Sequence, residues 1–392
     1  MTGRPAEIKS GVQWDRLKAP ILPWMLFYIC IMLPGMIHAK SSLSLLEVKL
    51  QNDIEDARLD DFLKIEAAFI LSGVHRSDSL QYYTGWYYQL LEKIEGFPFD
   101  KFNQAAAAGQ VFSYLHTSWL KTYQRESTDL LSIVHKQEYN CVAATILYNL
   151  ICEDLGWMTE AFETPTHVYT IFSNFTQPIT VENTSPLGFG IMKNLHEYSR
   201  YLARYYPENE VYRIGLDRLY AYENSQGRMI NNTELLGLLA YNRAVFTRKK
   251  EDYALAYEFV LLAQSFNTDS RSNIRFEKNL YYAWGKKLFD QQRYHEAFSV
   301  FADAVYRYPD MPDFIQNTRA SFFQSLNRFW KDRDWKNTGQ MIEEIRMLNV
   351  LEEKDRSQLI RLLEQWSYYF HRRSETSRLN DVHELLEAIK SD

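Results

Sequence analysis

Apolar residues recur at three- and four-residue spacing through most of the first third of the chain, with charged residues between them. The pattern is clearest in LSLLEVKLQNDIEDARLDDFLKIEAAFIL (43–71) and continues through 81–94 and 103–123. This spacing is that of amphipathic helices with one buried face. A Gly-Phe-Pro-Phe-Asp break at 96–100 separates two of them. The sequence therefore predicts helices from about residue 42 to 135.

The centre of the chain changes character. YNCVAATILYNLICEDLGW (139–157) is nearly all apolar, as in a buried helix, and is expected to end at Gly156. Residues 167–189 are rich in β-branched and aromatic side chains and are interrupted at 174–178, which predicts strand, turn and strand. A buried helix followed by a short antiparallel sheet makes an α+β domain, expected over residues 40–191.

From residue 192 onward the helical spacing returns, and residues 278–311 show a repeat. Small side chains recur there where two antiparallel helices would approach closely, with bulky ones between them: Gly285, Ala297 and Ala304, then Leu288, Tyr294 and Phe301. These spacings resemble a tetratricopeptide (TPR) repeat. A second unit at 237–270 and a degenerate third around Trp335 predict an all-α, TPR-like domain over 192–392, closed by a helix pair.

Composition and charge narrow the function classes. The chain has 392 residues, 46% of them hydrophobic and 24% charged, which is typical of a globular protein long enough for two domains. Its formal net charge of −6 comes with no broad basic patch. Nucleic acid is therefore not an expected partner.

The N-terminus reads as an export or anchoring signal. Arg4, Lys9, Arg16 and Lys18 precede an apolar segment, residues 19–39, that contains no charged residue. A basic flank followed by an apolar stretch fits a signal peptide, and the stretch is also long enough to span a bilayer. A cleaved signal and a retained membrane anchor both stay open. Either would place the body outside the cytoplasm, in the periplasm or an equivalent compartment.

Three cysteines argue against a disulfide framework. Cys30 lies in the apolar N-terminal segment, and Cys141 and Cys152 lie on one predicted helix, eleven residues apart. At the usual helical rise, about 16 Å separates the latter two, whereas a disulfide needs Cα atoms within roughly 7 Å. They cannot pair with each other. Cys152 fits an ordinary core position on an apolar helix.

Cys141 stands where a nucleophilic thiol is expected. It opens the predicted central helix, and the unpaired N–H groups and dipole of a helix N-terminus favour a thiolate. His167 follows 26 residues later at the head of the first predicted strand, and Glu182 follows 15 residues after His167 on the second. In a two-stranded hairpin, Glu182 could lie beside His167 and orient its imidazole, as a base in nucleophilic catalysis requires.

These motifs resemble the transglutaminase-like superfamily. The pattern is YNC-x₂-A-x₂-LY-x₄-EDLG-W, then P-x-HVY, then VENTSP. It is similar more narrowly to a bacterial branch in which such a domain is joined to TPR repeats. The resemblance implies a papain-like fold with Cys141 as nucleophile, His167 as base and Glu182 in a position usually held by Asp. Gln137, four residues before Cys141, is a candidate to assist an oxyanion hole.

Other chemistry has little support in the sequence. His75, His116, His135 and His196 have no partners at metal-ligand spacing, and no G-x-x-x-x-G-K-S/T or G-x-G-x-x-G motif occurs. Neither a metal nor another cofactor is therefore expected.

Two hypotheses follow from the sequence. In the first, the chain is an exported thiol enzyme acting on peptide or carboxamide bonds, a cysteine protease, amidase or transglutaminase-type acyltransferase. Its TPR-like half would recruit a protein substrate or partner. In the second, it is a non-catalytic scaffold that keeps the transglutaminase-like fold for protein–protein interaction.

Overall fold

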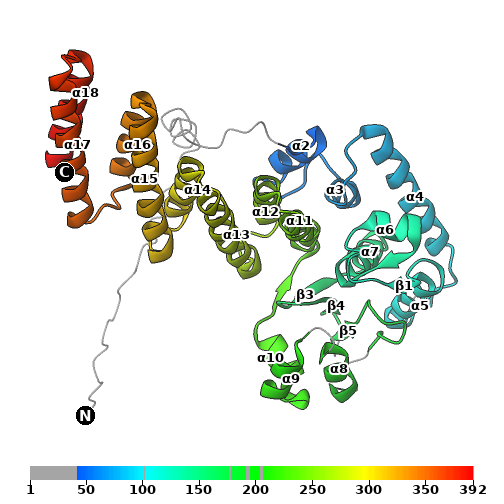
Figure 1. Ribbon diagram of the computed structural model, residues 1–392. Helices are drawn as coiled ribbons and strands as arrows, with labels where there is room; N and C mark the ends of the chain where they lie inside the picture. The colour runs from blue at the N-terminus through cyan, green and yellow to red at the C-terminus, as the bar shows by residue number, and fades with distance from the viewer. Residues whose placement is uncertain (1–41, 101, 176–177, 191–194, 204–205, 392) are drawn as a thin grey trace, which may run out of the picture. The chain divides into compact units, whose positions relative to one another are not determined.

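The computed structural model describes residues 42–100, 102–175, 178–190, 195–203 and 206–391 (Figure 1). The predicted signal or anchor segment, 19–39, lies outside these residues. Within them, none of the helices combines the length and hydropathy that crossing a bilayer requires. The chain is mostly helical with a small sheet, compatible with the α+β class, and divides between residues 287 and 288 into two compact units.

The N-terminal unit begins with the helices that the apolar spacing predicts. They are α2 (Leu45–Asp53), α3 (Lys64–Leu71), α4 (Ser77–Glu95), α5 (Gln104–Ser118) and α6 (Leu130–Lys136). The chain leaves α4 at Glu95 and enters α5 at Gln104, so the predicted break at 96–100 is confirmed. Two strands of two residues each, β1 (Thr122–Tyr123) and β2 (Glu138–Tyr139), pair in parallel beside α6.

The central helix α7 (Cys141–Asp154) is the middle of the core. Every residue from Cys141 to Cys152 is buried, because helices and strands cover α7 on all sides. Asn140 caps its start by accepting a hydrogen bond from the Ala143 N–H at 3.0 Å. The chain turns away after the helix at Gly156, whose φ of +77° lies in the left-handed region that favours glycine.

An antiparallel sheet follows α7, with strand order β5-β4-β3-β6. Its strands are β3 (Glu160–Glu163), β4 (Val168–Phe172), β5 (Ile179–Val181) and β6 (Arg228–Ile230). The predicted strand–turn–strand corresponds to β4 and β5, in a register that pairs Thr170 with Val181. Strands β3 and β6 are not predicted from the sequence, because strands of three or four residues are too short to display a period.

Among the described residues, three short helices separate β5 from β6: α8 (Leu195–Leu202), α9 (Glu208–Ile214) and α10 (Leu216–Ser225). They gather below the sheet in Figure 1 around a small apolar cluster that includes Leu202 and Leu219. After β6 the chain continues into α11 (Asn232–Lys249), which packs against α3, α7 and α12 (Tyr253–Phe266). The boundary expected at 191/192 thus falls between two strands of one sheet.

Helix α13 (Arg271–Asp290) contains the division between the units. The C-terminal unit continues with α14 (Tyr294–Arg307), α15 (Pro312–Asp332), α16 (Trp335–Leu348), α17 (Glu353–Arg372) and α18 (Thr376–Ser391). Its core gathers around Phe298, Phe322, Leu359 and Trp366. Helix breaks fall at 291–293 and 333–334, and α17 and α18 are the last two helices of the unit.

Candidate active site

Cys141 is the first residue of α7. The first N–H groups of a helix have no partner within the helix and carry its partial positive charge. The Asn140 side chain accepts a hydrogen bond from the Ala143 N–H. Cys141 and Val142, the first two residues of the helix, line a cleft. A thiol in this position faces the positive end of the helix dipole and lies beside the first backbone N–H groups of α7.

His167 is fixed by a tight turn between β3 and β4. Its backbone N–H donates to Thr164 Oγ1 at 3.0 Å, and the Thr164 N–H donates back to the His167 carbonyl at 2.8 Å. The strand pairing of Glu163 with Val168 closes the same turn. Because both backbone groups of His167 are held, its imidazole projects from a defined point at the head of β4.

Glu182 directly follows β5 and meets His167. Its Oε2 lies 2.7 Å from His167 Nε2, and both side chains are completely buried. Glu182 Oε1 accepts hydrogen bonds from the backbone N–H of Thr184, at 3.1 Å, and from the Thr184 hydroxyl. The structure therefore brings together the base and the acidic residue that the sequence singled out. Glu182 keeps both carboxylate oxygens satisfied.

The electrostatics of the pair favour its charged form. Burial alone would lower the pKa of His167, but the Glu182 carboxylate and the Cys141 thiol outweigh it and raise that pKa well above its ordinary value. Burial would likewise raise the pKa of Glu182, yet His167 and the Thr184 hydrogen bonds hold it lower. Both pKa shifts favour an imidazolium bound to a carboxylate.

The Cys141 thiol adjoins this pair, since it is one of the groups that raise the pKa of His167. Glu182 engages Nε2 of the His167 ring, and Cys141 and His167 line the same cleft. The order of groups is the Cys141 thiol, the His167 imidazole and the Glu182 carboxylate, which is the order that a nucleophile, a base and an orienting acid require. All three residues predicted from the sequence meet at one point, from α7, β4 and the end of β5.

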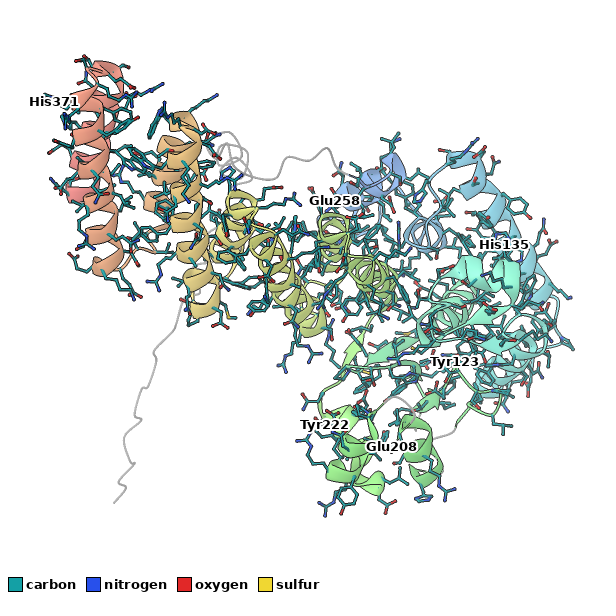
Figure 2. All side chains as sticks on the ribbon, in the orientation of Figure 1. Tyr123, His135, Glu208, Tyr222, Glu258 and His371 are labelled. Atoms are coloured by element: carbon teal, nitrogen blue, oxygen red, sulfur yellow. The ribbon has the colours of Figure 1, made fainter. Side chains whose placement is uncertain are left out.

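A cleft of about 290 Å³ opens over Cys141 and His167. Its walls come from the start of α7, the β3–β4 turn, one face of α11 and the loop that follows β1, and Ser272 of α13 completes it. Tyr123, labelled in Figure 2, belongs to the loop side of this wall. An open cleft above Cys141 and His167 would let a substrate carbonyl reach a side chain that is otherwise buried.

Two other residues named in the sequence analysis lie elsewhere. Gln137 ends α6 with a left-handed backbone, φ 58°, and its side-chain amide donates to the Ser118 carbonyl at 3.0 Å, so that amide is not aimed at Cys141. Cys152 is fully buried near the far end of α7, where burial raises the pKa of its thiol. Cys152 is thus a core residue, and both cysteines are free thiols.

Several residues around His167 gave no signal in the sequence. Glu223, buried in α10, accepts hydrogen bonds from the hydroxyls of Thr164 and Thr166, the latter at 2.7 Å. Thr164 in turn accepts from the His167 N–H, so a chain of hydrogen bonds links α10 to the backbone of the base. Nothing in the sequence indicated a partner 57 residues downstream of Thr166.

Glu163 ties the same turn to β6. Burial raises the pKa of Glu163, opposed by Arg228 and Asn267, and the Arg228 guanidinium lies 3.3 Å from its carboxylate. Asn267 donates a hydrogen bond to the same carboxylate at 3.4 Å. The β3 end of the turn is therefore braced by residues from β6 and from the end of α12, as the α10 contacts brace its other end.

Two of the histidines that the sequence excludes as metal ligands have other partners in the structure. His135 Nε2 lies 2.9 Å from the Tyr83 hydroxyl, and His196 Nδ1 lies 3.0 Å from the Asp217 carboxylate. In the part of the chain that the structure describes, no three His, Cys, Asp or Glu side chains are grouped so that they could hold a metal ion.

A second cleft, of about 540 Å³, belongs to the C-terminal unit. It lies among α16, α17 and α18 and is floored by the aromatic rings of Trp335, Trp366 and Phe370. Trp335 and Phe370 meet edge to face with ring centroids 4.6 Å apart. No predicted site residue lies in this cleft.

Comparison with known proteins identifies no family. No protein-family model and no curated protein matches the chain. Among solved structures, the chain is similar to menin, in a crystal structure described as revealing the binding site for Mixed Lineage Leukemia (MLL) protein. The likeness has 11% sequence identity and a TM-score of 0.35, and it covers 88% of this chain and 91% of menin. At these values it carries no argument about fold or function.

Proposed function

We propose that this protein is a transglutaminase-like thiol enzyme acting on peptide or carboxamide bonds. The observation that carries the proposal is the buried 2.7 Å contact of His167 Nε2 with Glu182 Oε2, beside a cysteine at a helix start and beneath a cleft. A purely structural pair would gain nothing from an adjoining thiol or from an open path to it.

In the proposed reaction, Cys141 Sγ attacks the carbonyl carbon of an amide. The carbonyl oxygen becomes an oxyanion in the tetrahedral intermediate, and the backbone N–H groups of Cys141 and Val142, which line the cleft, are the proposed donors to it. His167 then gives its proton to the amide nitrogen as the C–N bond breaks. Ammonia or an amine leaves, and the acyl group stays on Sγ as a thioester.

The second half of the reaction regenerates the thiol. His167, now neutral, accepts a proton from water or from a second amine as it attacks the thioester carbonyl. Water gives a carboxylic acid, so the outcome is proteolysis or deamidation. An amine gives a new amide, so the outcome is cross-linking. Glu182 keeps His167 oriented and stabilises its protonated form throughout.

The N-terminal segment and the helical repeats would determine where this reaction takes place and on which protein. The basic and apolar N-terminal segment supports action outside the cytoplasm, after cleavage of a signal or from a membrane anchor. The TPR-like spacing of residues 278–311 supports recruitment of a protein substrate or partner by the helical repeats.

The reactivity of the Cys141 thiol distinguishes an enzyme from a non-catalytic scaffold. The experiment alkylates the full chain with iodoacetamide at about pH 7 and measures the rate at each cysteine by peptide mapping, with glutathione as an ordinary thiol. An enzyme predicts that Cys141 reacts faster than glutathione and Cys152, and that His167→Ala slows Cys141 alone. Equally slow labelling of Cys141 and Cys152, unchanged by His167→Ala, would favour the scaffold.

A reactive thiol then allows the reaction type to be assigned. Wild type and Cys141→Ser are incubated with a glutamine-rich protein such as casein and a fluorescent primary amine. Released ammonia reports deamidation, new N-termini report proteolysis, and covalent fluorescence reports transfer to an amine. Each signal has to disappear in Cys141→Ser to be attributed to this site.

A further inference from the structure

One face of α11 forms a wall of the Cys141 cleft. Its cleft-lining residues recur three and four positions apart: Leu238, Tyr241, Asn242, Val245, Phe246 and Lys249. Such spacing places side chains in one stripe along a helix. From the first to the last, the stripe is about 16 Å long. That length matches about five residues of extended polypeptide, and it is more than a single carboxamide would need.

Asn242 lies in the middle of this otherwise mostly apolar stripe. Its side-chain Nδ2 is buried and has no hydrogen-bond partner among the residues that the structure describes. A buried donor without a partner is costly, so such a group is unusual unless something else satisfies it. Because Asn242 lines the cleft, a carbonyl oxygen of a molecule bound there is a fitting acceptor.

The rim of the cleft carries an excess of positive charge. Arg125 and Lys249 are both exposed, and neither forms an ion pair with any described residue. Glu126 is the exposed carboxylate that opposes them, whereas the cleft's other acidic residue outside the His167 pair, Glu163, is engaged by Arg228. Two cations against one anion favour acidic groups on a molecule that enters between these walls.

We propose that the cleft binds an acidic polypeptide segment along α11. In this arrangement Asn242 donates a hydrogen bond to a main-chain carbonyl of the segment, and Arg125 and Lys249 attract its carboxylates. The segment thereby presents an amide to Cys141. This inference rests on the proposed function and names its substrate class, with Asn242 as a positioning residue.

The test uses three alkylating probes on the full chain. They are iodoacetamide and two iodoacetyl tetrapeptide amides, one Gly-Glu-Gly-Glu and the other Gly-Lys-Gly-Lys. The alkylation rate at Cys141 with each peptide is divided by the rate with iodoacetamide, which removes differences in thiol reactivity. The acidic peptide is expected to react severalfold faster than the basic one, with the difference shrinking at high salt.

Variants of the cleft wall distinguish the parts of the proposal. Asn242→Leu keeps the size of the side chain but removes the donor, and it is expected to lower the normalised rate of the acidic peptide about threefold to tenfold. Asn242→Gln, which keeps a donor, should recover part of the rate. Arg125→Ala with Lys249→Ala should bring the two peptides close to equal rates. Circular dichroism checks that each variant is folded.

A binding measurement makes the inference independent of thiol chemistry. The same acidic tetrapeptide, carrying fluorescein in place of the iodoacetyl group, is titrated with Cys141→Ser and followed by anisotropy. The inference predicts weaker binding when Asn242→Leu is added. Equal binding with and without Asn242→Leu, or equal affinity for the acidic and basic peptides, would overturn it. Slow alkylation of Cys141 by iodoacetamide would instead count against the proposed enzyme, and the anisotropy result would still decide the binding site.

Discussion

His167 Nε2 lies 2.7 Å from Glu182 Oε2, and neither side chain reaches solvent. The two residues are fifteen positions apart in the sequence, and the register that pairs Thr170 with Val181 brings them together. A buried ion pair stabilises a fold only when its remaining polar atoms are also bonded. Glu182 meets this condition through Thr184, and the backbone N–H of His167 is held by Thr164.

Replacing Glu182 tests whether its charge holds His167 in the protonated form. Glu182→Gln keeps the shape but removes the charge that raises the pKa of His167. We expect the iodoacetamide rate at Cys141 near neutral pH to fall on the order of a hundredfold, as expected when a base loses its orienting carboxylate.

Glu182→Asp is the matched control for this change. It keeps the charge but shortens the side chain by one methylene, so the 2.7 Å contact can form only after a small shift of the backbone. We expect a loss smaller than in Glu182→Gln. Equal losses in the two variants would mean that geometry, and not charge, is what Glu182 contributes.

The absence of a side chain at Gly188 leaves the space that the Glu182 backbone occupies. The Gly188 carbonyl accepts a hydrogen bond from the Glu182 N–H at 3.0 Å, and a Cβ at Gly188 would lie 1.9 Å from the Glu182 carbonyl oxygen. Because that neighbour is backbone, it cannot rotate away. Gly188→Ala should therefore destabilise the fold by roughly 1–3 kcal/mol and also slow alkylation of Cys141.

Gly85 offers the control for that substitution. It lies within α4, and a Cβ there would meet no atom within 4 Å. Gly85→Ala should leave Cys141 reactivity unchanged and stabilise the protein by up to about 1 kcal/mol through helix propensity. Urea denaturation measures both variants. A Gly188→Ala protein as stable and as reactive as the wild type would contradict the predicted contact.

Glu223 is predicted to position His167 from a distance. Glu223→Ala leaves the hydroxyls of Thr164 and Thr166 without their acceptor and loosens the turn that holds the His167 backbone. We expect a stability loss of about 1–3 kcal/mol and slower alkylation of Cys141, with partial rescue of the rate in Glu223→Gln. A structural role alone would lower stability but leave the rate of the folded protein unchanged.

The control for the Glu223 substitution lies in the same helical segment between β5 and β6. Glu208, labelled in Figure 2, is exposed on the first turn of α9, next to α10 in the chain. Glu208→Ala should change stability by less than about 0.5 kcal/mol and leave Cys141 reactivity as in the wild type.

The sequence predicted the residues of the candidate site better than its surroundings. Cys141 could be placed because a long apolar run beginning after Asn140 marks a helix start, and His167 and Glu182 because two β-rich runs flank a turn. Each of these signals is local. The pairing of β4 with β5 follows from the short connection between them, so the meeting of His167 and Glu182 could be anticipated.

What could not be predicted depends on contacts between distant segments. Strand β6 completes the sheet beside β3 although three described helices separate it from β5, and its three residues show no period. Glu223 and Asn242 look like ordinary polar positions on helices in the sequence. Their roles arise only because α10 packs beneath the His167 turn and α11 lines the cleft.

His116 predicts how the protein responds to acid. It is buried on α5, and burial lowers its pKa from 6.5 to about 4. The unfolded chain therefore takes up a proton at this residue as the pH falls below 6.5, while the native state does not until about pH 4. Stability falls through that window, by at most about 3 kcal/mol from this group.

His116→Leu removes the titrating group while keeping an apolar side chain in place. The urea midpoint of the variant should change less between pH 7 and pH 4.5 than that of the wild type. Identical pH dependence in the two proteins would show that His116 is not held neutral in the native state.

The most direct test of the central claim is the pH dependence of Cys141 alkylation by iodoacetamide. An ordinary thiol titrates near pH 8.5, so its rate falls about tenfold for each pH unit below that value. A thiolate held by the imidazolium of His167 predicts a rate at Cys141 that changes less than about threefold between pH 8 and pH 6. The same measurement on His167→Ala should then follow the ordinary thiol. A wild-type profile that already falls tenfold per unit, and is unchanged by His167→Ala, would contradict the account.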